Sequence, residues 1–293
     1  MENKLIEIYL LVCHIYDMNK HLHLQENRNR LPNLTVPELM TIYLFGQLNG
    51  HFRHRHIYNF IRHYWSDWFP ALGSYQAFNR RLNLLENNFH ALFDALLSGL
   101  PQREAAAETN DYLVDSMPIM LACGTRSRRA RVAPELARCG FSAVKQTNFH
   151  GVRLHLIARR QTARLPLPTN LWLKEGNVHD LVALREKSDE LPSQINLFAD
   201  KAYADTNLKA ELQTRGIRLL TPAKKPKTEE LSDGQKQVNK TISTFRQPIE
   251  SFFKWLIDKT DIQKASSVRS TEGLLIHCIG KLSFALLLLN FYY

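Results

Sequence analysis

The sequence shows no pattern of a disulfide framework, a nucleotide-binding loop or a signal peptide, and each of these absences excludes a class of protein. Its four cysteines are Cys13, Cys123, Cys139 and Cys278. They form no CxxC pair, so neither a disulfide scaffold nor a cysteine zinc site is expected, and a reducing cytoplasm fits. No GxxxxGKS or GxxxxGKT loop is present, so Walker-type nucleotide hydrolysis is not implied. The opening segment MENKLIEIYL mixes both charges and is not expected to be a signal peptide.

The sequence also has no long uninterrupted apolar run. The apolar stretch 274–293 is broken by His277 and Lys281, and its unbroken part, 282–289, is too short to span a bilayer. We therefore expect a buried helix packed on a sheet, and no membrane partner.

Charge is the first positive signal. The chain has 293 residues, of which 44% are hydrophobic, enough for one large domain or two ordinary ones with a full core. Its formal net charge is +10. An excess of this size indicates a polyanionic partner, either nucleic acid or an anionic membrane. A basic ribosome-associated or housekeeping protein is the alternative.

The first hundred residues have a helical pattern. Thr35-Val-Pro-Glu38 is a capping box with proline in the first turn, and the helix it opens has a stop at Asn49-Gly50. Further helices are predicted over 58–65 and from Ser74. We expect residues 1–100 to form a helix-turn-helix-like DNA-binding region, and 101–109 a linker.

On the third of these helices, Arg80 and Arg81 are candidate DNA contacts. A small helical bundle with solvated basic faces is the competing interpretation.

Beyond the linker the pattern changes to strands alternating with helices, which predicts an α/β domain with a mixed sheet over 110–293. The predicted strands are 112–115, 151–158, 195–200 and 217–220, the predicted helices are 207–214 and 242–258, and 224–239 is predicted to be a loop.

Three acids in this half are candidate metal ligands. Asp115 and Asp200 each end an apolar strand, and Glu250 lies at the edge of an apolar helix face. Each has an ordinary alternative. The aspartates suit strand-to-turn junctions, and Glu250 could join Arg246 and Lys254 in a solvated salt-bridge ladder.

Five short motifs occur in the order seen in a known family. They are Asp115-Ser-Met-Pro-Ile119, Asn148-Phe-His-Gly-Val-Arg-Leu-His155, Asn177-Val-His-Asp180, Asp200-Lys-Ala-Tyr203 and Arg246-Gln-Pro-Ile-Glu250. Together they resemble the DDE transposases of bacterial insertion sequences, and within them the insertion-sequence family nine-eight-two. The resemblance covers roughly residues 110 to 290 and includes the R-x-x-x-E helix signature of the broader group.

The resemblance implies an RNase H-like fold in which Asp115, Asp200 and Glu250 are the catalytic metal ligands. Their separations are 85 (200 minus 115) and 50 (250 minus 200), and the second leaves no room for a large inserted β-domain. One departure concerns the helix signature, where Phe245 stands in place of a tyrosine before Arg246. The lysine that follows the glutamate in the wider group cannot be assigned.

The implied reaction is cleavage of DNA at terminal inverted repeats and transfer of the cut strands to target DNA. Two Mg²⁺ ions, with Mn²⁺ as a substitute, stabilise the attacking and leaving oxygens of such a displacement, and carboxylates are suitable ligands for them. The partners implied are double-stranded DNA and at least one further copy of the chain. The rivals are a structure-specific nuclease of the same fold and a non-catalytic DNA-binding regulator derived from a transposase.

Basic clusters are the candidate DNA contacts of this half, with solvated loops as the alternative. The predicted contacts are Arg126, Arg128, Arg129, Arg131, Arg153, Arg246 and Lys254. Two further features have structural interpretations. The histidines 51, 54 and 56 suit a basic surface better than a metal site, and Asp180 is a good helix N-cap before Leu181.

Overall fold

The chain folds into two compact units in the computed structural model, which describes residues 1–19, 33–103, 109–223 and 231–292. The helical unit comprises Met1–Gln102, Asp258–Ile262 and Val268–Tyr293, and the sheet unit comprises Arg103–Ile257 and Gln263–Ser267. The predicted division at residues 101–109 is therefore incomplete, because the last part of the chain folds with the first. Part of the predicted linker, 104–108, lies outside the described residues.

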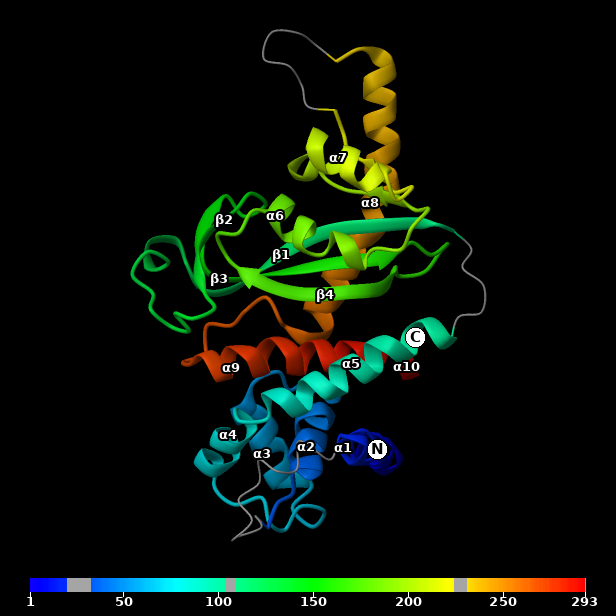
Figure 1. The fold of residues 1–293 in the computed structure, drawn as a ribbon. Helices are drawn as coiled ribbons and strands as arrows, with labels where there is room; N and C mark the ends of the chain where they lie inside the picture. Colours follow the sequence, from blue (N-terminus) through cyan, green and yellow to red (C-terminus); the bar gives the residue numbers. More distant parts are fainter. Residues whose placement is uncertain (20–32, 104–108, 224–230, 293) are drawn as a thin grey trace. The chain divides into compact units, whose positions relative to one another are not determined.

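The helical unit is built from helices at the two ends of the sequence (Figure 1). Its members are α1 (Glu2–Met18), α2 (Val36–Leu48), α3 (His54–Tyr64), α4 (Tyr75–Leu82), α5 (Glu86–Arg103), α9 (Thr271–Leu275), the π-turn η5 (Ile276–Gly280) and α10 (Lys281–Phe291). The predicted capping box is present, since the Thr35 side chain accepts from the Glu38 N–H and the Glu38 carboxylate accepts from the Thr35 N–H. The connection from α3 to α4 covers residues 65–74, longer than the three- or four-residue turn of a helix-turn-helix.

Helix α10 is buried among helices of its own unit, whereas a sheet was expected as its partner. Ser283 Oγ donates to the Phe89 carbonyl at 3.2 Å, and Asn290 Nδ2 donates to the Leu96 carbonyl at 3.1 Å, both on α5. The stretch Thr271–Phe291 is long and apolar enough to cross a membrane, but 83% of its most apolar window is buried inside the protein. That burial is typical of the core helix of a globular unit.

The sheet unit contains six strands in a mixed sheet. They are β1 (Asp111–Cys123), β2 (Arg138–Ser142), β3 (Thr147–Arg159), β4 (Leu167–Glu175), β5 (Asn196–Phe198) and β6 (Arg218–Leu220). The order is β2-β3-β1-β5-β6, and β4 also pairs with β3. Strand β1 is antiparallel to β3 and parallel to β5, and β5 is parallel to β6. The predicted mixed α/β architecture is confirmed.

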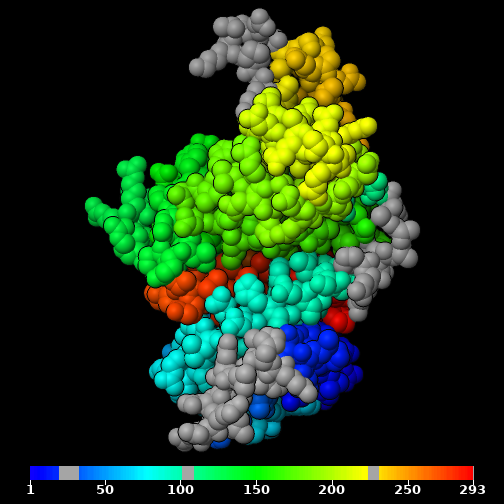
Figure 2. Space-filling model, viewed as in Figure 1, coloured from blue at the N-terminus to red at the C-terminus, as the bar shows by residue number. Residues whose placement is uncertain are grey.

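Within the described residues, the α-helices that accompany the sheet are α6 (Asp180–Glu186), α7 (Thr206–Gln213) and α8 (Asp233–Thr260). Helix α7 begins one residue before the predicted start, because the Asp205 side chain caps it by accepting from the Leu208 N–H at 2.8 Å. In Figure 2 the green and yellow atoms of the sheet unit form one continuous mass. The first turns of α8 project beyond it in both views, and their side chains are mostly exposed.

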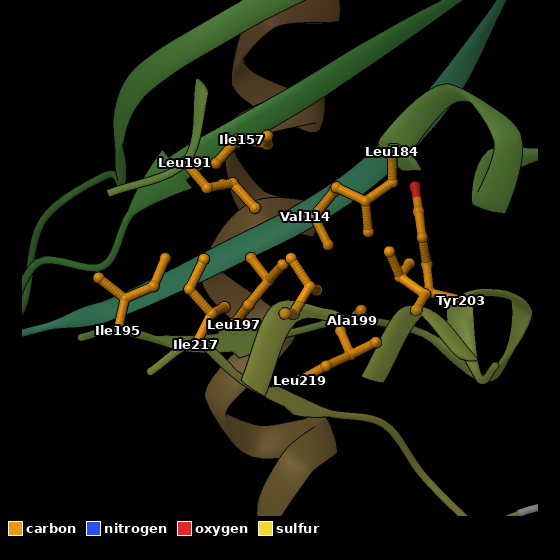
Figure 3. Close-up of a cluster of buried hydrophobic side chains, with 12 residues drawn as sticks. Val114, Ile157, Leu184, Leu191, Ile195, Leu197, Ala199, Tyr203, Ile217 and Leu219 are labelled. Atoms are coloured by element: carbon orange, nitrogen blue, oxygen red, sulfur yellow. The ribbon is translucent and has the colours of Figure 1, made fainter. Parts of the chain in front are cut away.

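One apolar cluster fixes the parallel part of the sheet. Val114 from β1, Leu197 from β5 and Leu219 from β6 pack together (Figure 3), and all are nearly inaccessible to solvent. Leu184 of α6 and Leu208 of α7 cover the same face. This cluster holds β1 and β5 in the parallel register that sets the positions of the acids described below.

Two elements are longer than predicted. Strand β1 continues past Asp115 to Cys123, because Met117 and Ile119 are buried and the strand stays paired with β3. Asp115 is thus a mid-strand residue rather than a strand end. Helix α8 begins at Asp233, so the last part of the predicted 224–239 loop is helical, while 224–230 lie outside the described residues.

Proline does not stop α8. Pro248 lies inside the helix rather than in its first turn. Proline removes one backbone donor, which usually bends or breaks a helix. Here Ile249, Phe252 and Leu256 are buried on one face, and their packing offsets the lost hydrogen bond.

Candidate active site

Asp115 and Asp200 are brought together by the register of two parallel strands. The β1–β5 pairing ends at Leu113 opposite Phe198. Asp115 and Asp200 each lie two residues beyond that last pair. Equal offsets beyond the end of parallel pairing place both side chains at the same edge of the sheet. The predicted convergence of the two aspartates therefore follows from the sheet itself.

Each aspartate is also fixed by a local hydrogen bond. Asp115 Oδ1 accepts from the Ser116 N–H at 2.8 Å. Asp200 Oδ1 accepts from the Lys201 N–H at 2.7 Å and caps the short 3-10 turn η4 (Lys201–Tyr203). The turn-capping alternative is thus present for Asp200, but only one of its oxygens is used in this way.

A guanidinium group bridges the two carboxylates. Arg246 of α8 donates through Nη2 to Asp115 Oδ2 at 3.0 Å, and its Nη1 lies 3.7 Å from Asp200 Oδ1. The Arg246 side chain is only 10% exposed. The guanidinium neutralises both carboxylates, which are the type of oxygen ligand that a divalent metal also uses.

The pKa of Asp115 is set by opposing effects. Burial raises the pKa of Asp115 from 3.8 to about 6, while Arg246 and the Ser116 N–H lower it and the carboxylates of Asp180 and Asp200 raise it. Several like charges in a partly desolvated place favour a bound cation. Both the contacts of the Asp115–Asp200 pair with Arg246 and the electrostatics of Asp115 therefore favour a cation between the two carboxylates.

Asp180 faces this cluster, although we expected it to cap α6. The cap is His179, whose Nδ1 accepts from the Leu181 N–H at 3.2 Å. Asp180 Oδ1 instead accepts from Ser116 Oγ at 2.6 Å and lies 3.8 Å from Arg153 Nη1. It is thus tied to the residue that follows Asp115. The only sequence signal for this position is the Asn177–Asp180 motif.

Two buried polar side chains lie next to these acids. Both ring nitrogens of His155 and the Tyr203 hydroxyl lack a hydrogen-bond partner within the described residues, and both side chains are almost fully buried. His155 Nδ1 is 4.0 Å from Asp180, and its ring stacks on Trp172. Burial lowers the pKa of His155 to about 4, so the ring is neutral at pH 7. Burial raises the pKa of Tyr203, and the carboxylates of Asp180 and Asp115 add to that rise.

Glu250 lies one helical turn after Arg246 on α8, and its side chain is exposed. Among the described residues no ion pair joins Glu250 to Arg246 or Lys254, so the alternative of a solvated salt-bridge ladder is not observed. Within the same residues no three acidic, histidine or cysteine side chains are grouped closely enough to hold a metal ion. The structure brings two of the three predicted ligands together, and the role of Glu250 stays a prediction.

Of the predicted DNA contacts in the sheet unit, Arg246 lies against the acid pair, and the others fall into three environments. Arg126, Arg128 and Arg129 are exposed and line a cleft of about 790 Å³, which is formed mainly by the residues that come after β1 in the sequence. Arg131 is also exposed but does not line this cleft. Lys254 is exposed on α8. Arg153 is different. Its guanidinium donates to the carbonyls of Phe141 at 2.6 Å and Gly176 at 3.3 Å. Because these donors are used internally, the geometry favours a structural role for Arg153.

A family model described as "Transposase DDE domain" matches residues 105–270, which is more than half of the chain. The matched stretch contains every residue of the acid cluster and the whole cleft lined by arginines. Comparison with curated proteins and with solved structures finds no match.

Proposed function

Because the chain belongs to the family of transposase DDE domains, we propose that it cuts DNA at the terminal inverted repeats of a mobile element and joins the cut ends to target DNA. The family makes the chain a transposase and a nucleic-acid-cleaving enzyme. The specific reaction, the RNase H-like fold, the kinship to insertion-sequence family nine-eight-two and the residues that act are our proposal. A bacterial cytoplasm, with the protein on the nucleoid when bound to DNA, belongs to the same proposal.

The observation that carries the proposal is the bridged acid pair. Asp115 and Asp200 come from neighbouring parallel strands, lie at equal offsets beyond the paired segment and share one cation, the Arg246 guanidinium. Two carboxylates around a cation at a sheet edge are what phosphodiester cleavage assisted by divalent metal requires. We assign Asp115, Asp200 and Glu250 as the residues that hold Mg²⁺ or Mn²⁺.

The metal, when bound, supplies charge stabilisation for the attacking and leaving oxygens and an activated nucleophile. The chain supplies position. The Ser116 N–H orients one oxygen of Asp115, and the Lys201 N–H orients one oxygen of Asp200. The other oxygens contact Arg246 or are open to a ligand. Hydrolysis and strand transfer then differ only in whether water or a DNA 3′-OH attacks.

Arg246 has two chemically equivalent uses in this proposal. Its planar fork matches carboxylates and phosphates equally well. In the structure it neutralises the acid pair, and on DNA it would donate to a phosphate near the scissile bond. The Arg126, Arg128 and Arg129 cleft provides further phosphate contacts away from the acids. Two ends must be cut and joined together, so at least two copies of the chain act on DNA.

The test compares single acid replacements with a matched exposed acid. Asp115→Asn, Asp200→Asn and Glu250→Gln are incubated with the element's terminal DNA and Mg²⁺ or Mn²⁺, beside Asp189→Asn, whose side chain is fully exposed. We expect cleavage to fall on the order of 10³-fold or more in the three variants, because loss of a metal ligand costs more than the 10- to 100-fold typical of losing a hydrogen-bond partner of a ligand. DNA binding and the Asp189 control remain near the parent's values.

Each outcome assigns a role. Full activity in one of the three variants removes that residue from the metal site. Cleavage without joining of a pre-cut 3′-OH end to a plasmid would favour a nuclease of the same fold. DNA binding without cleavage under every divalent ion would favour the regulator derived from a transposase.

A further inference from the structure

The helical unit has its own strongly basic stretch, separate from the acid cluster. Between residues 51 and 83 the sequence has five arginines, at positions 53, 55, 62, 80 and 81, and a single acid, Asp67. We propose that the α3–α4 cleft, lined by Arg55 and Arg62, binds the phosphate backbone of double-stranded DNA. The inference rests on the proposed function, because it takes DNA as the partner. It adds a second DNA-binding site, in the helical unit, to the site proposed in the sheet unit.

The cleft is a defined hollow rather than a charged surface alone. It measures about 540 Å³ and is bounded by α3, the connection after it and the first turn of α4. Its lining is Arg55, Tyr58, Arg62, Ser66, Phe69, Pro70, Leu72, Gly73, Ser74, Tyr75 and Gln76. This lining contains two cations and no carboxylate. In water such a place attracts an anion, because nothing inside it neutralises the arginines.

One of the two arginines is held in place by an aromatic ring. The Arg55 guanidinium lies 4.0 Å from the centre of the Tyr75 ring, at the start of α4. Tyr58 fixes the same region, since its hydroxyl donates to the Gly73 carbonyl at 2.8 Å and its ring contacts Tyr75. A guanidinium stacked on a ring keeps its N–H edge open for phosphate and loses less freedom on binding.

The first turn of α4 adds backbone donors. The first N–H groups of a helix have no acceptor within it, and the residues carrying them here, Tyr75 and Gln76, line the cleft. Ser74 caps the helix by accepting from the Ala77 N–H at 3.3 Å, which satisfies a donor further along. Arginine side chains and helix N–H groups are both common phosphate ligands in DNA complexes.

The spacing of the arginines favours an extended polyanion over a single small anion. Arg55 and Arg62 are seven residues apart on α3, about 10 Å along the axis at 1.5 Å per residue. Successive phosphates of a DNA strand can each contact one of these arginines, whereas a single small anion would have to draw both side chains to one point. Arg80 and Arg81, the contacts predicted from sequence, lie in the last turn of α4 and outside the cleft lining.

The experiment measures binding of terminal double-stranded DNA by fluorescence anisotropy, without divalent metal, from 50 to 200 mM salt. The variants are Arg55→Gln and Arg62→Gln, with Arg80→Gln as the test of the sequence prediction. Lys4→Gln is the matched control, because it removes one exposed positive charge from α1 in the same unit. Circular dichroism establishes that each variant is folded.

We expect Arg55→Gln and Arg62→Gln each to weaken binding on the order of five- to tenfold at 0.1 M salt. Each should lower the slope of log K against log salt by about 1, as the loss of one phosphate contact does. Arg55→Lys should lose less than Arg55→Gln, since the charge stays but the fork does not. Lys4→Gln should remain within about twofold of the parent.

Three results would contradict the proposal that the α3–α4 cleft binds DNA. Arg55→Gln and Arg62→Gln could bind with the parent's affinity and salt slope, or Lys4→Gln could lose as much as they do. Binding of anionic vesicles but not DNA through the same arginines would replace DNA by a membrane. If the parent cleaves DNA while the arginine variants bind it normally, the DNA-binding role of the cleft is rejected and the proposed function is retained. A parent that neither binds nor cleaves DNA defeats the proposed function itself.

Discussion

The two units use the same residue, arginine, in opposite settings. In the sheet unit Arg246 is nearly buried and faces two carboxylates. In the helical unit Arg55 and Arg62 are exposed and line a cleft without an acid. A buried guanidinium acts on the acids beside it, whereas an exposed one without a counter-charge is suited to an incoming polyanion. Burial and the nearest opposite charge, rather than residue type, therefore separate the two uses.

Among changes to the two kinds of arginine, the largest effect is expected from removing the buried Arg246. Arg246 lowers the pKa of Asp115, so Arg246→Gln should raise that pKa further above about 6 and leave two carboxylates without their cation. We expect DNA cleavage at pH 7 to fall on the order of 100-fold, about 2.7 kcal/mol of transition-state stabilisation. The pH at half-maximal rate should move upward, because the ionised carboxylate is the form that binds metal. Cleavage rates between pH 5 and 9 measure both.

Two further variants, Arg246→Lys and Arg55→Gln, are controls for the shift in pH midpoint that is expected in Arg246→Gln. The lysine keeps the charge and should shift the pH midpoint less than glutamine does. Arg55→Gln should leave the midpoint unchanged while weakening DNA binding. An unchanged midpoint in Arg246→Gln would show that the guanidinium does not tune Asp115.

Adding one methyl group to each unit should show whether they unfold separately. A Cβ at Gly151 in β3 would overlap the Ile119 carbonyl oxygen of β1, and one at Gly280 would lie 2.8 Å from the Tyr43 ring. Overpacking of this kind costs about 1–3 kcal/mol. Gly151→Ala should lower protection in the sheet unit and Gly280→Ala in the helical unit, as measured by hydrogen exchange with mass spectrometry. Equal losses in both units from either variant would mean that they unfold together.

A smaller effect is expected from Asp180→Asn. Asp180 accepts from Ser116 Oγ, so the amide should weaken the placement of the neighbouring Asp115 without removing a metal ligand. We expect roughly a tenfold loss of cleavage, as for outer-shell partners of a metal site, and a higher Mg²⁺ concentration for half-maximal thermal stabilisation. Ser116→Ala should resemble it, and the double variant should lose little more than either one. Fully additive losses would contradict the coupling.

The smallest expected effect is a difference in acid sensitivity. Burial lowers the pKa of His277 to about 3. The unfolded state of the helical unit therefore binds a proton below pH 6.5 that the folded state does not, and stability is lost as pH falls from 6.5 toward 3. Asp115, with its raised pKa, has the opposite sign, because its contribution is lost as pH rises from about 4 to about 6. Hydrogen exchange at pH 7 and 5 should show a larger loss of protection around α10 than around β1, and His277→Gln should reduce that difference.

Local signals predicted local structure well. The Thr35 capping box and the strand before Asp200 were both visible in the sequence, because each depends on residues a few positions apart. That Asp115 and Asp200 converge was instead implied by the family resemblance, because they lie 85 positions apart and Asp115 is a mid-strand residue. The family model match confirms the DDE resemblance that was based on the five motifs.

Contacts between distant residues were not predictable from the sequence alone. Asp180 has the pattern of a helix cap, and only the fold shows that its carboxylate accepts from Ser116, 64 positions away. Arg153 was expected on DNA, yet its donors contact Phe141 and Gly176. The partners of α10 are on α5, 194 positions earlier for Ser283 and Asn290. Spacing within the sequence holds no information about such pairs.

The split composition of the helical unit also sets an order of events during protein synthesis. Helix α5 ends at Arg103 and α9 begins at Thr271, so the ribosome produces the whole sheet unit between them, in roughly 8 to 30 seconds at 5–20 residues per second. During that interval the apolar surfaces of α2 and α5 await partners that have not yet been made. The unit with the acid pair can therefore fold before the unit with the basic cleft, and a ribosome that stops before α9 leaves a nascent chain that depends on chaperones.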